Sequence, residues 1–303
     1  MKQYLDLVRT ILEQGNLKPN RTGIDTLSYF AYPFRHDLQE GFPLLTTKKM
    51  DGKLWNSMVH ELLWFMSGEN HIRNLREKTH IWDAWADDDG NLETAYGFYW
   101  RHFPSTGGRM VPDIQKMHMW DRQEFGQYEY TNIDQLAWCI DQLKTNPNNR
   151  RLVVSAWEPA NAINSKLPPC HLLFIFNVQA GRLCLQVLMR SVDCFLGFPF
   201  NLASYALLDH IVAQEVGLIP GILSFMLTDV HIYIAGSEDD HLVNGVPACE
   251  YDHEKVCLEQ LKREPYPLPQ IKIAKKPWNT LQFADFQLVG YQSHPRLKAR
   301  VAV

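Results

Sequence analysis

The sequence predicts one folded α+β domain that spans residues 1–303. Hydrophobic residues make up 46% of the 303 residues and aromatic residues 12%, so the chain can bury a large core. Segments whose apolar residues repeat at helical spacing are mixed along the chain with segments that alternate like strands. The sequence contains no internal repeat, low-complexity stretch or Ser-, Gly- or Pro-rich linker, which favours one domain over two.

The N-terminal part predicts a helix, a strand and a second helix. Apolar residues repeat at helical spacing over residues 4–12 and stop before Gly15, which indicates an amphipathic helix. Residues 26–34 alternate and are rich in β-branched and aromatic side chains, so they predict a strand. Residues 54–66 predict the second helix. Residues 106–127 are rich in Gly, Met, His and Gln without a clear period, and we expect an irregular surface segment there.

The middle of the chain predicts a helix over residues 133–143 and a strand over residues 151–157. Two further strands, 172–178 and 182–189, are joined by the turn Ala180-Gly181.

The longest strongly apolar helix candidate covers residues 202–216 and ends at Gly217 before Pro220, so we expect it to run through the core. Residues 223–234 predict a strand. The acidic residues 238–240 then predict a solvated loop.

Charge and apolar pattern exclude several classes of protein. The chain has 30 Lys and Arg against 34 Asp and Glu, a formal charge of −4, whereas a nucleic-acid binder has a cationic excess. A disordered chain would not carry this hydrophobic content. The apolar runs fall short of the roughly 18 residues of a membrane helix, and the N-terminal residues lack the pattern of a signal peptide. We therefore expect a cytoplasmic protein with no membrane partner.

The six cysteines do not form a metal-binding pattern. No CxxC pair and no His/Cys ligand spacing occurs, which argues against zinc, and we predict no metal. A chain of 35.2 kDa does not need disulfide bonds to fold. We expect free, mostly buried thiols.

Cys170 is the first candidate for chemistry, because Pro168 and Pro169 fix the backbone just before it. A cysteine nucleophile needs nearby cations to favour the thiolate, and Arg150-Arg151 and Arg190 are candidates. Composition alone favours the alternative, a buried structural cysteine beside a structural histidine, His171.

The segment from Arg190 to Asn201 is the second candidate. Arg190 next to Ser191 can hold a phosphate through charge-assisted hydrogen bonds, and Asn201 can present a donor and an acceptor to a pyrimidine edge. The alternative is a capped loop between a strand and a helix, and Arg150-Arg151 can equally be a solvated pair.

A dozen motifs in order resemble the thymidylate synthase family, and the similarity runs from Met1 to Val303. The motifs are Asn20-Arg21-Thr22-Gly23, Gly41-Phe42-Pro43-Leu44-Leu45-Thr46-Thr47-Lys48, His60-Glu61-Leu62-Leu63-Trp64-Phe65, Ile81-Trp82-Asp83-Ala84-Trp85-Ala86-Asp87, Ala95-Tyr96-Gly97, Asn149-Arg150-Arg151, Pro168-Pro169-Cys170-His171, Arg190-Ser191 with Asp193, Leu196-Gly197-Phe198-Pro199-Phe200-Asn201, Asp229-Val230-His231-Ile232-Tyr233, Arg263-Glu264-Pro265 and Val301-Ala302-Val303. The resemblance implies an α/β domain around a large mixed β-sheet, with the sheets of two subunits packed face to face in a homodimer.

The resemblance also implies how dUMP is bound and activated. Cys170 would attack C6 of the uracil ring and make C5 nucleophilic, Glu61 and Tyr96 would move protons at C5 through ordered water, and Asn201 would read O4 and N3–H. The phosphate and the sugar 3′-hydroxyl would be held by further residues. These are Arg21, Arg190 and Ser191 for the phosphate, joined by Arg150 and Arg151 from the other subunit, and His231 and Tyr233 for the sugar.

The co-substrate implied by the resemblance is 5,10-methylenetetrahydrofolate. Lys48 would lie near the folate glutamate tail, and the carboxylate of Val303 would close the site as a lid that excludes water. The folate-binding wall would consist of Trp82, Trp85, Asp193, Leu196 and Gly197, of which Asp193 also counts among the catalytic residues.

Several positions depart from the family pattern. Met189 replaces the usual Gln, as in related phage pyrimidine-nucleotide hydroxymethylases. Residues 234–237 replace the Asn-His pair that usually follows the Tyr233 position, and Arg300 stands where the tail usually has Pro. The intact C-terminal tail and Trp82 favour thymidylate synthase, which produces dTMP. The alternative suggested by Met189 is a dUMP 5-hydroxymethylase, in which water traps the same intermediate and gives 5-hydroxymethyl-dUMP and tetrahydrofolate.

Two other classes of function are disfavoured. A cysteine hydrolase that uses Cys170 and His171 is disfavoured because adjacent residues on a strand point to opposite faces. A nucleic-acid-binding role would need a basic face with exposed aromatic residues, and the charge balance gives no sign of one.

Overall fold

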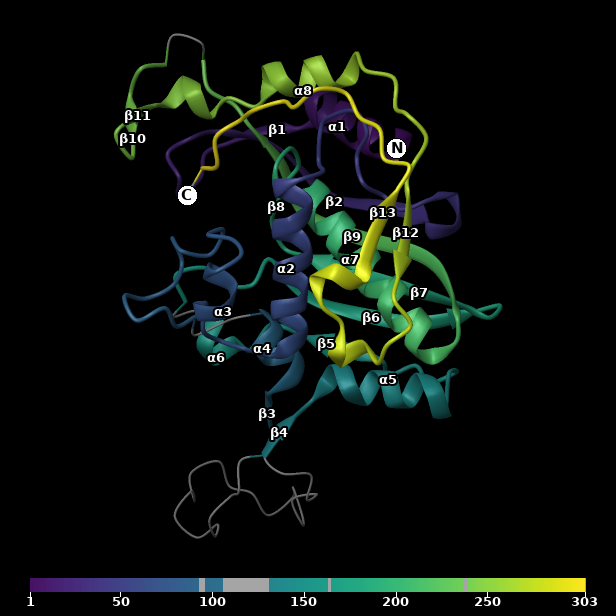
Figure 1. Cartoon of the computed structure of the whole chain (residues 1–303). Helices are drawn as coiled ribbons and strands as arrows, with labels where there is room; N and C mark the ends of the chain where they lie inside the picture. Colours follow the sequence, from purple (N-terminus) through teal and green to yellow (C-terminus); the bar gives the residue numbers. More distant parts are fainter. Residues whose placement is uncertain (93–95, 106–130, 163–164, 237–238, 303) are drawn as a thin grey trace, which may run out of the picture.

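The computed structural model describes residues 1–92, 96–105, 131–162, 165–236 and 239–302 (Figure 1). The segment 106–127, for which an irregular structure was predicted, lies outside the described residues. Among the described residues no helix is long and apolar enough to cross a membrane.

A mixed sheet of seven strands forms the centre of the described fold, in the order β1-β2-β9-β7-β6-β5 with β8 beside β9. Neighbouring strands are antiparallel, except that β7 and β8 run parallel to β9. The strands are β1 (Asn16–Lys18), β2 (Thr26–Asp37), β5 (Val153–Ser155), β6 (His171–Gln179), β7 (Arg182–Met189), β8 (Val192–Asp193) and β9 (Ile219–Tyr233).

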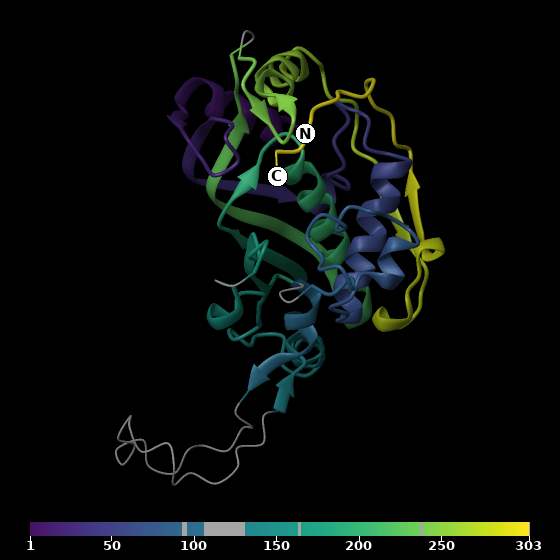
Figure 2. The same cartoon turned by 90° about the vertical axis from the view of Figure 1, so that its left-hand side faces the viewer.

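Helices cover one face of this sheet. Figure 2 shows α7 and α2 on the same side of the strands. The helices are α1 (Lys2–Gln14), α2 (Lys53–Ser67), α3 (Arg73–Arg76), α4 (Tyr96–Arg101), α5 (Gln135–Thr145), α6 (Pro159–Ala162), α7 (Gly197–Val216) and α8 (Glu254–Leu261).

Three two-stranded sheets and several 3₁₀ turns complete the described structure. The small sheets pair β3 (Phe103–Ser105) with β4 (Thr131–Ile133), β10 (Leu242–Val243) with β11 (Val246–Pro247), and β12 (Gln270–Ile273) with β13 (Phe286–Val289). The 3₁₀ turns include Leu38–Glu40, Ala248–Tyr251, Trp278–Thr280 and Phe283–Asp285. The sequence did not predict these short elements, because two to four residues carry too little periodicity to be recognised.

The long predicted elements are confirmed with small changes at their ends. The predicted strand 182–189 matches β7, whereas the strand predicted over 151–157 is shorter and covers only β5. The apolar helix predicted from Leu202 begins at Gly197, so Asn201 lies inside α7 and not in a loop before it. Pro199 lies in the first turn of α7, where a helix tolerates proline because its first N–H groups have no partner within the helix.

Helix α7 is buried on all sides, as expected of a helix that crosses a core. It packs on the face of the sheet that carries Leu185 and Val187 of β7 and Phe225 of β9. A network of aromatic rings, which includes Phe34, Phe198 and Phe225, fills the space between them. The N-terminus of α7 therefore has a fixed position relative to the strand ends.

The opposite face of the sheet is only partly covered. Buried Leu183, Leu185 and Val187 alternate along β7 with Cys184 and Leu188, which are half-buried. This face has no helical layer of its own in the described structure, and its apolar side chains suit an interface.

The excursion after β9 corrects the prediction for this region. The predicted strand 223–234 ends at Tyr233, and the chain leaves the body and returns at His253. The backbone N–H of His253 donates to the carbonyl of Tyr233 at 2.9 Å, so His253 follows Tyr233 in space. His253 thus lies where the histidine of the usual Asn-His pair is expected, and an insertion separates it from Tyr233 in the sequence.

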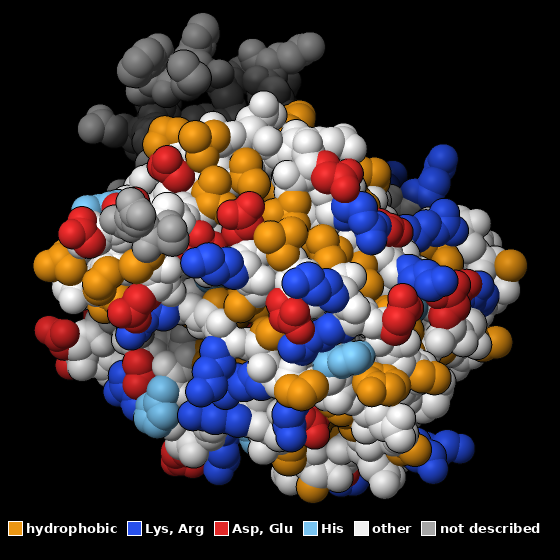
Figure 3. Space-filling view, turned by 90° about the horizontal axis from the view of Figure 1, so that it is seen from above, with side chains coloured by type: hydrophobic (Ala, Val, Ile, Leu, Met, Phe, Trp, Pro, Cys, Tyr) orange, Lys and Arg blue, Asp and Glu red, His pale blue; other side chains and the backbone are white. Residues whose placement is uncertain are grey.

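All six cysteines are free, as predicted, but only half of them are buried. Cys139, Cys194 and Cys257 are buried, and the others are half-buried. On the face seen in Figure 3, Lys and Arg side chains lie beside Asp and Glu, so the near balance of charge also holds locally on this face.

Gly97 allows helices α4 and α2 to approach closely. A Cβ atom at Gly97 would lie 2.0 Å from the carbonyl oxygen of Phe65, a backbone atom of α2. Because backbone atoms cannot rotate away, only glycine fits. The close approach sets the position of Tyr96, the residue before it.

We predict that Gly97→Ala lowers the free energy of unfolding by about 3 kcal/mol, because α4 must move away from α2. Chemical denaturation monitored by tryptophan fluorescence measures this change. Gly236→Ala is the matched control, because its Cβ would meet only Asp239 at 3.9 Å. Equal stability of the two variants would contradict the packing argument.

Candidate active site

A cavity of about 510 Å³ lies next to Cys170, where β6 begins and β7 and β9 end. These ends meet at one edge because β6 and β7 are antiparallel and β7 and β9 are parallel. The cavity brings together six residues predicted from the sequence. They are Arg21, Cys170, Arg190, Ser191, His231 and Tyr233.

Cys170 is held by backbone hydrogen bonds on both sides. Its N–H donates to Oη of Tyr96 at 2.6 Å, and its carbonyl accepts from the N–H of Arg190 at 2.9 Å. The side chain is half-buried and borders the cavity. Cys170 is therefore not fully buried, and its role in chemistry stays a prediction.

The guanidinium of Arg190 is fixed beside the thiol. Its Nε donates to the carbonyl of Pro169 at 2.9 Å and its Nη2 to the carbonyl of Pro168 at 2.6 Å. Nη2 also lies 3.8 Å from Sγ of Cys170. The guanidinium thus places a positive charge next to the sulfur of Cys170.

Three charged residues that line the cavity were not predicted as site residues from the sequence. Lys18 and Lys166 add positive charge, and Asp229 forms an ion pair with Lys18. Hydrogen bonds from His231, Lys18 and Ser28 hold the pKa of Asp229 well below its usual range. No sequence motif marks the two lysines, because only the sheet edge brings them to the cavity.

Glu61 is a buried carboxyl on α2. Trp82 Nε1 donates a hydrogen bond of 2.7 Å to its Oε1. Burial raises the pKa of Glu61 to about 7, against the weaker opposing effect of the bond from Trp82. A carboxyl with this pKa can both accept and release a proton near neutral pH.

Tyr96 is buried between α2 and the Cys170 corner. Burial raises the pKa of its phenol well above the usual value, so the hydroxyl stays protonated. While Oη accepts from Cys170, the hydroxyl proton remains able to serve as a donor. Its ring packs against Phe65, Trp82 and His171.

His171 has a larger part in the site than the sequence analysis gave it. Its ring hydrogen-bonds the side chain of Asn201 and lies 3.1 Å from Oη of Tyr205. Burial lowers its pKa to about 4, so the ring is neutral at pH 7. His171 thus lies between Asn201 and Tyr205, next to Cys170 in the sequence. Its position directly after the cysteine was the only available signal.

Three of the predicted folate-binding residues, Asp193, Leu196 and Gly197, lie at the start of α7. Asp193 Oδ1 accepts from the backbone N–H groups of Phe195 and Leu196 at 2.8 and 3.0 Å. A Cβ at Gly197 would meet only Asp193 Cβ at 3.6 Å, so the backbone is open to a flat ring. Trp85 is half-buried, whereas Trp82 is 9% exposed.

Two further predicted residues have different outcomes. Lys48 is buried, its Nζ donates to the carbonyl of Phe195, and its pKa is lowered to about 8 by burial. Its contact with a folate tail stays a prediction and requires Nζ to leave Phe195. Val303 lies outside the described residues.

Arg150 and Arg151 are not among the residues that line the cavity. Both are exposed in the turn between α5 and β5. Among the described residues no group of three or more His, Cys, Asp or Glu is placed to hold a metal ion.

We predict that Glu61→Gln stabilises the fold increasingly as the pH rises. The folded carboxyl keeps its proton up to a pKa of about 7, while the unfolded one loses it near 4.5, so wild-type stability falls across this window. Between pH 4.5 and pH 7 the difference in the free energy of unfolding between the variant and wild type should rise by about 3 kcal/mol in favour of the variant. Urea denaturation at several pH values measures it, and a difference independent of pH would exclude the buried charge.

Comparisons with known proteins agree with this geometry. The family model described as thymidylate synthase matches residues 2–303. A thymidylate synthase from Haloferax volcanii is 43% identical over 334 aligned positions, which cover 98% of this chain and 95% of the relative. The chain therefore belongs to the thymidylate synthase family and is a folate-dependent methyltransferase that converts dUMP to dTMP.

Proposed function

We propose that the cavity beside Cys170 binds dUMP and that Cys170 is the nucleophile of the reaction. The observation that carries this proposal is the thiol at 3.8 Å from the fixed guanidinium of Arg190, in a cavity that Arg21 and Lys18 also line. The nucleotide phosphate would be held by Arg21, Arg190 and Ser191 through charge-assisted hydrogen bonds.

The thiolate of Cys170 would form a bond to C6 of the uracil ring. The electron pair of the C5–C6 double bond then moves toward C5 and O4, which makes C5 a nucleophile. After C5 has formed a bond to the one-carbon unit and lost its proton, the bond from that unit to the folate would break and leave an exocyclic methylene on C5. Hydride from the folate would then add to this methylene, the C5–C6 double bond would form again, and the sulfur would leave as the thiolate. Covalent catalysis thus replaces one difficult substitution with several easier steps.

Asn201 would read O4 and N3–H of the base. Its hydrogen bond to neutral His171 supports this role, because a fixed ring leaves the amide in one orientation. His231 and Tyr233, which both border the cavity, would hold the sugar 3′-hydroxyl.

Glu61 and Tyr96 would move protons at C5 through ordered water. Glu61 suits this role because of its pKa of about 7, and Tyr96 because its hydroxyl stays protonated next to Cys170.

The residues at the start of α7 fit a reduced folate. The open backbone at Gly197, next to Asp193 and Leu196, leaves room for a flat ring, and Trp82 and Trp85 supply aromatic surface. When bound, 5,10-methylenetetrahydrofolate supplies the one-carbon unit and the hydride. Lys48 would reach the glutamate tail of the folate.

We expect Cys170→Ser to retain dUMP binding and to lose turnover by more than roughly 10³-fold, because a serine hydroxyl is not ionised beside Arg190. Calorimetry measures the binding of dUMP, and chromatography with mass detection identifies the products. Wild type should give dTMP and dihydrofolate. Undiminished turnover in the variant would exclude Cys170 as the nucleophile, and 5-hydroxymethyl-dUMP from wild type would contradict hydride transfer.

The active form would be a homodimer with the sheets of two subunits face to face. The half-buried apolar side chains on the uncovered face of the sheet and Phe30, which is 78% exposed on β2, support this arrangement. Because Arg150 and Arg151 do not line the cavity of their own chain, they would complete the phosphate site of the partner.

Mixing inactive variants tests the shared site. Cys170→Ser and the double variant Arg150→Ala/Arg151→Ala should each be nearly inactive. Mixed dimers have one site with intact cysteine and arginines, so an equal mixture should regain about a quarter of wild-type activity after subunit exchange. Full activity of the double arginine variant alone, or no recovery on mixing, would rule out the shared site.

The other expectations from the sequence also enter the proposal. The chain would form one catalytic domain over residues 1–303 and act in the cytoplasm, without a nucleic acid or membrane partner. The mixed charge on the face in Figure 3 supports the absence of a nucleic-acid site on that face.

A further inference from the structure

The excursion after β9 is closed at its base by Asp252. One carboxylate oxygen of Asp252 accepts from the N–H of Ala235 at 3.3 Å, and the other accepts from the N–H of Glu254 at 2.7 Å. We call residues 239–253 the clasp. Because its two ends are tied together, the clasp has a defined position on the body of the protein.

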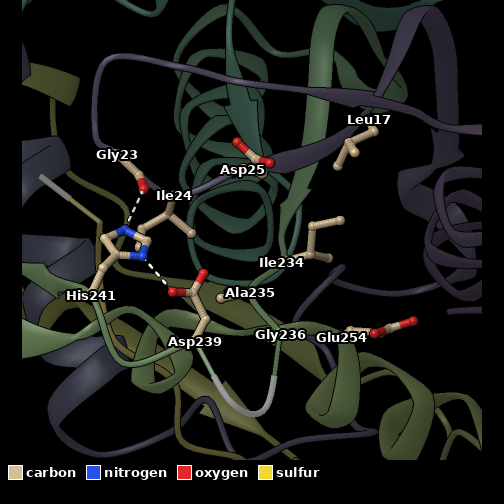
Figure 4. A pocket seen from close by; sticks show the side chains of 10 residues that line it. All are labelled: Leu17, Gly23, Ile24, Asp25, Ile234, Ala235, Gly236, Asp239, His241 and Glu254. Atoms are coloured by element: carbon tan, nitrogen blue, oxygen red, sulfur yellow. Dashed lines mark hydrogen bonds and ion pairs between the residues drawn. The ribbon is translucent and has the colours of Figure 1, made fainter.

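The clasp contacts the loop that carries Arg21. His241 Nε2 donates to the carbonyl of Gly23 at 3.1 Å, and Asp239 holds the other ring nitrogen (Figure 4). Ile24, one residue further, is 1% exposed. It packs in a small apolar cluster with Val243, Ala248 and Tyr251 of the clasp.

The clasp also contacts the C-terminal tail. Arg300 Nε donates to Oε2 of Glu250 at 2.7 Å, and the buried ring of His253 donates to the carbonyl of Arg300 at 2.8 Å. Ala302 packs against the same apolar cluster that holds Ile24.

This arrangement brings the tail to the edge of the candidate active site. Tyr233 packs against the clasp cluster, as Ala302 does, and it also lines the cavity with Cys170. The ring of His253 lies between the carbonyl of Arg300 and the carboxylate of Asp193, whose Oδ1 is 3.8 Å from Nδ1. Two features that depart from the family pattern, the insertion and Arg300, thus contact each other.

We propose that the clasp holds the C-terminal tail in place over the active site, and that Glu250 is a positioning residue that acts through Arg300. The proposal rests on the proposed function and on the expectation from the sequence that the carboxylate of Val303 closes the site. Three different interactions hold the tail: a hydrogen bond to the carbonyl of Arg300, the ion pair of its side chain and the packing of Ala302. The clasp therefore fixes both the position and the direction of the tail. Its release would expose the site to water and weaken folate binding.

The charge reversal Glu250→Arg tests the clasp. The side chains of Glu250 and Arg300 are 47% and 52% exposed, so their ion pair is screened by solvent. Replacing attraction by repulsion should shift the equilibrium between the held and the released tail by roughly five- to tenfold toward the released tail. We expect carboxypeptidase to release Val303 faster by this factor and KM for methylenetetrahydrofolate to rise similarly, with dUMP affinity unchanged. Glu254→Arg, the same charge change on α8, is the control and should change neither quantity.

The swapped pair separates positioning from a general structural effect. Arg300→Glu alone should behave like Glu250→Arg, and Glu250→Arg/Arg300→Glu should restore both the slow release of Val303 and the low KM. Unchanged release in Glu250→Arg, or no recovery in the swapped pair, would overturn the proposal. The release assay needs no turnover, so an inactive wild type would reject the proposed function while the clasp is still tested.

Discussion

The corner that presents Cys170 depends on the guanidinium of Arg190. Pro168 and Pro169 have no backbone N–H groups and therefore cannot donate hydrogen bonds that would hold the corner. Their carbonyl oxygens instead accept hydrogen bonds from the side chain of Arg190. The same guanidinium lies beside the thiol. One side chain therefore fixes the backbone of the corner and also places a positive charge next to the thiol of Cys170.

The sheet and α7 position the other candidate site residues around the Cys170 corner. Cys170 precedes β6, Arg190 follows β7 and His231 lies near the end of β9, and the hydrogen-bond register of the strands brings these positions to one edge. Helix α7 is packed on all sides, so Asn201 cannot shift relative to that edge. The rigidity of the core thus determines the distances between side chains that are far apart in the sequence.

Burial gives the polar residues of the site their chemical character. The apolar surroundings raise the pKa of Glu61 to about 7, lower that of His171 to about 4 and keep the hydroxyl of Tyr96 protonated. Near neutral pH these groups are a proton carrier, a neutral hydrogen-bonding ring and a donor. The same residue types on an exposed loop would have their ordinary pKa values and would not have these protonation states near neutral pH.

The sequence by itself determined the long elements and the family and named the candidate site residues, because periodicity and short motifs are local properties of the chain. It could not place Lys18, Lys166 or Asp229 at the cavity, since only strand register brings them to Cys170. From the sequence, the Asn-His pair that usually follows the Tyr233 position was judged to be absent. In the folded chain His253 lies next to Tyr233, although an insertion separates the two residues in the sequence. The pKa of Glu61 and the contact between Arg300 and Glu250 were decided by the tertiary structure alone, because both depend on which distant groups surround a side chain.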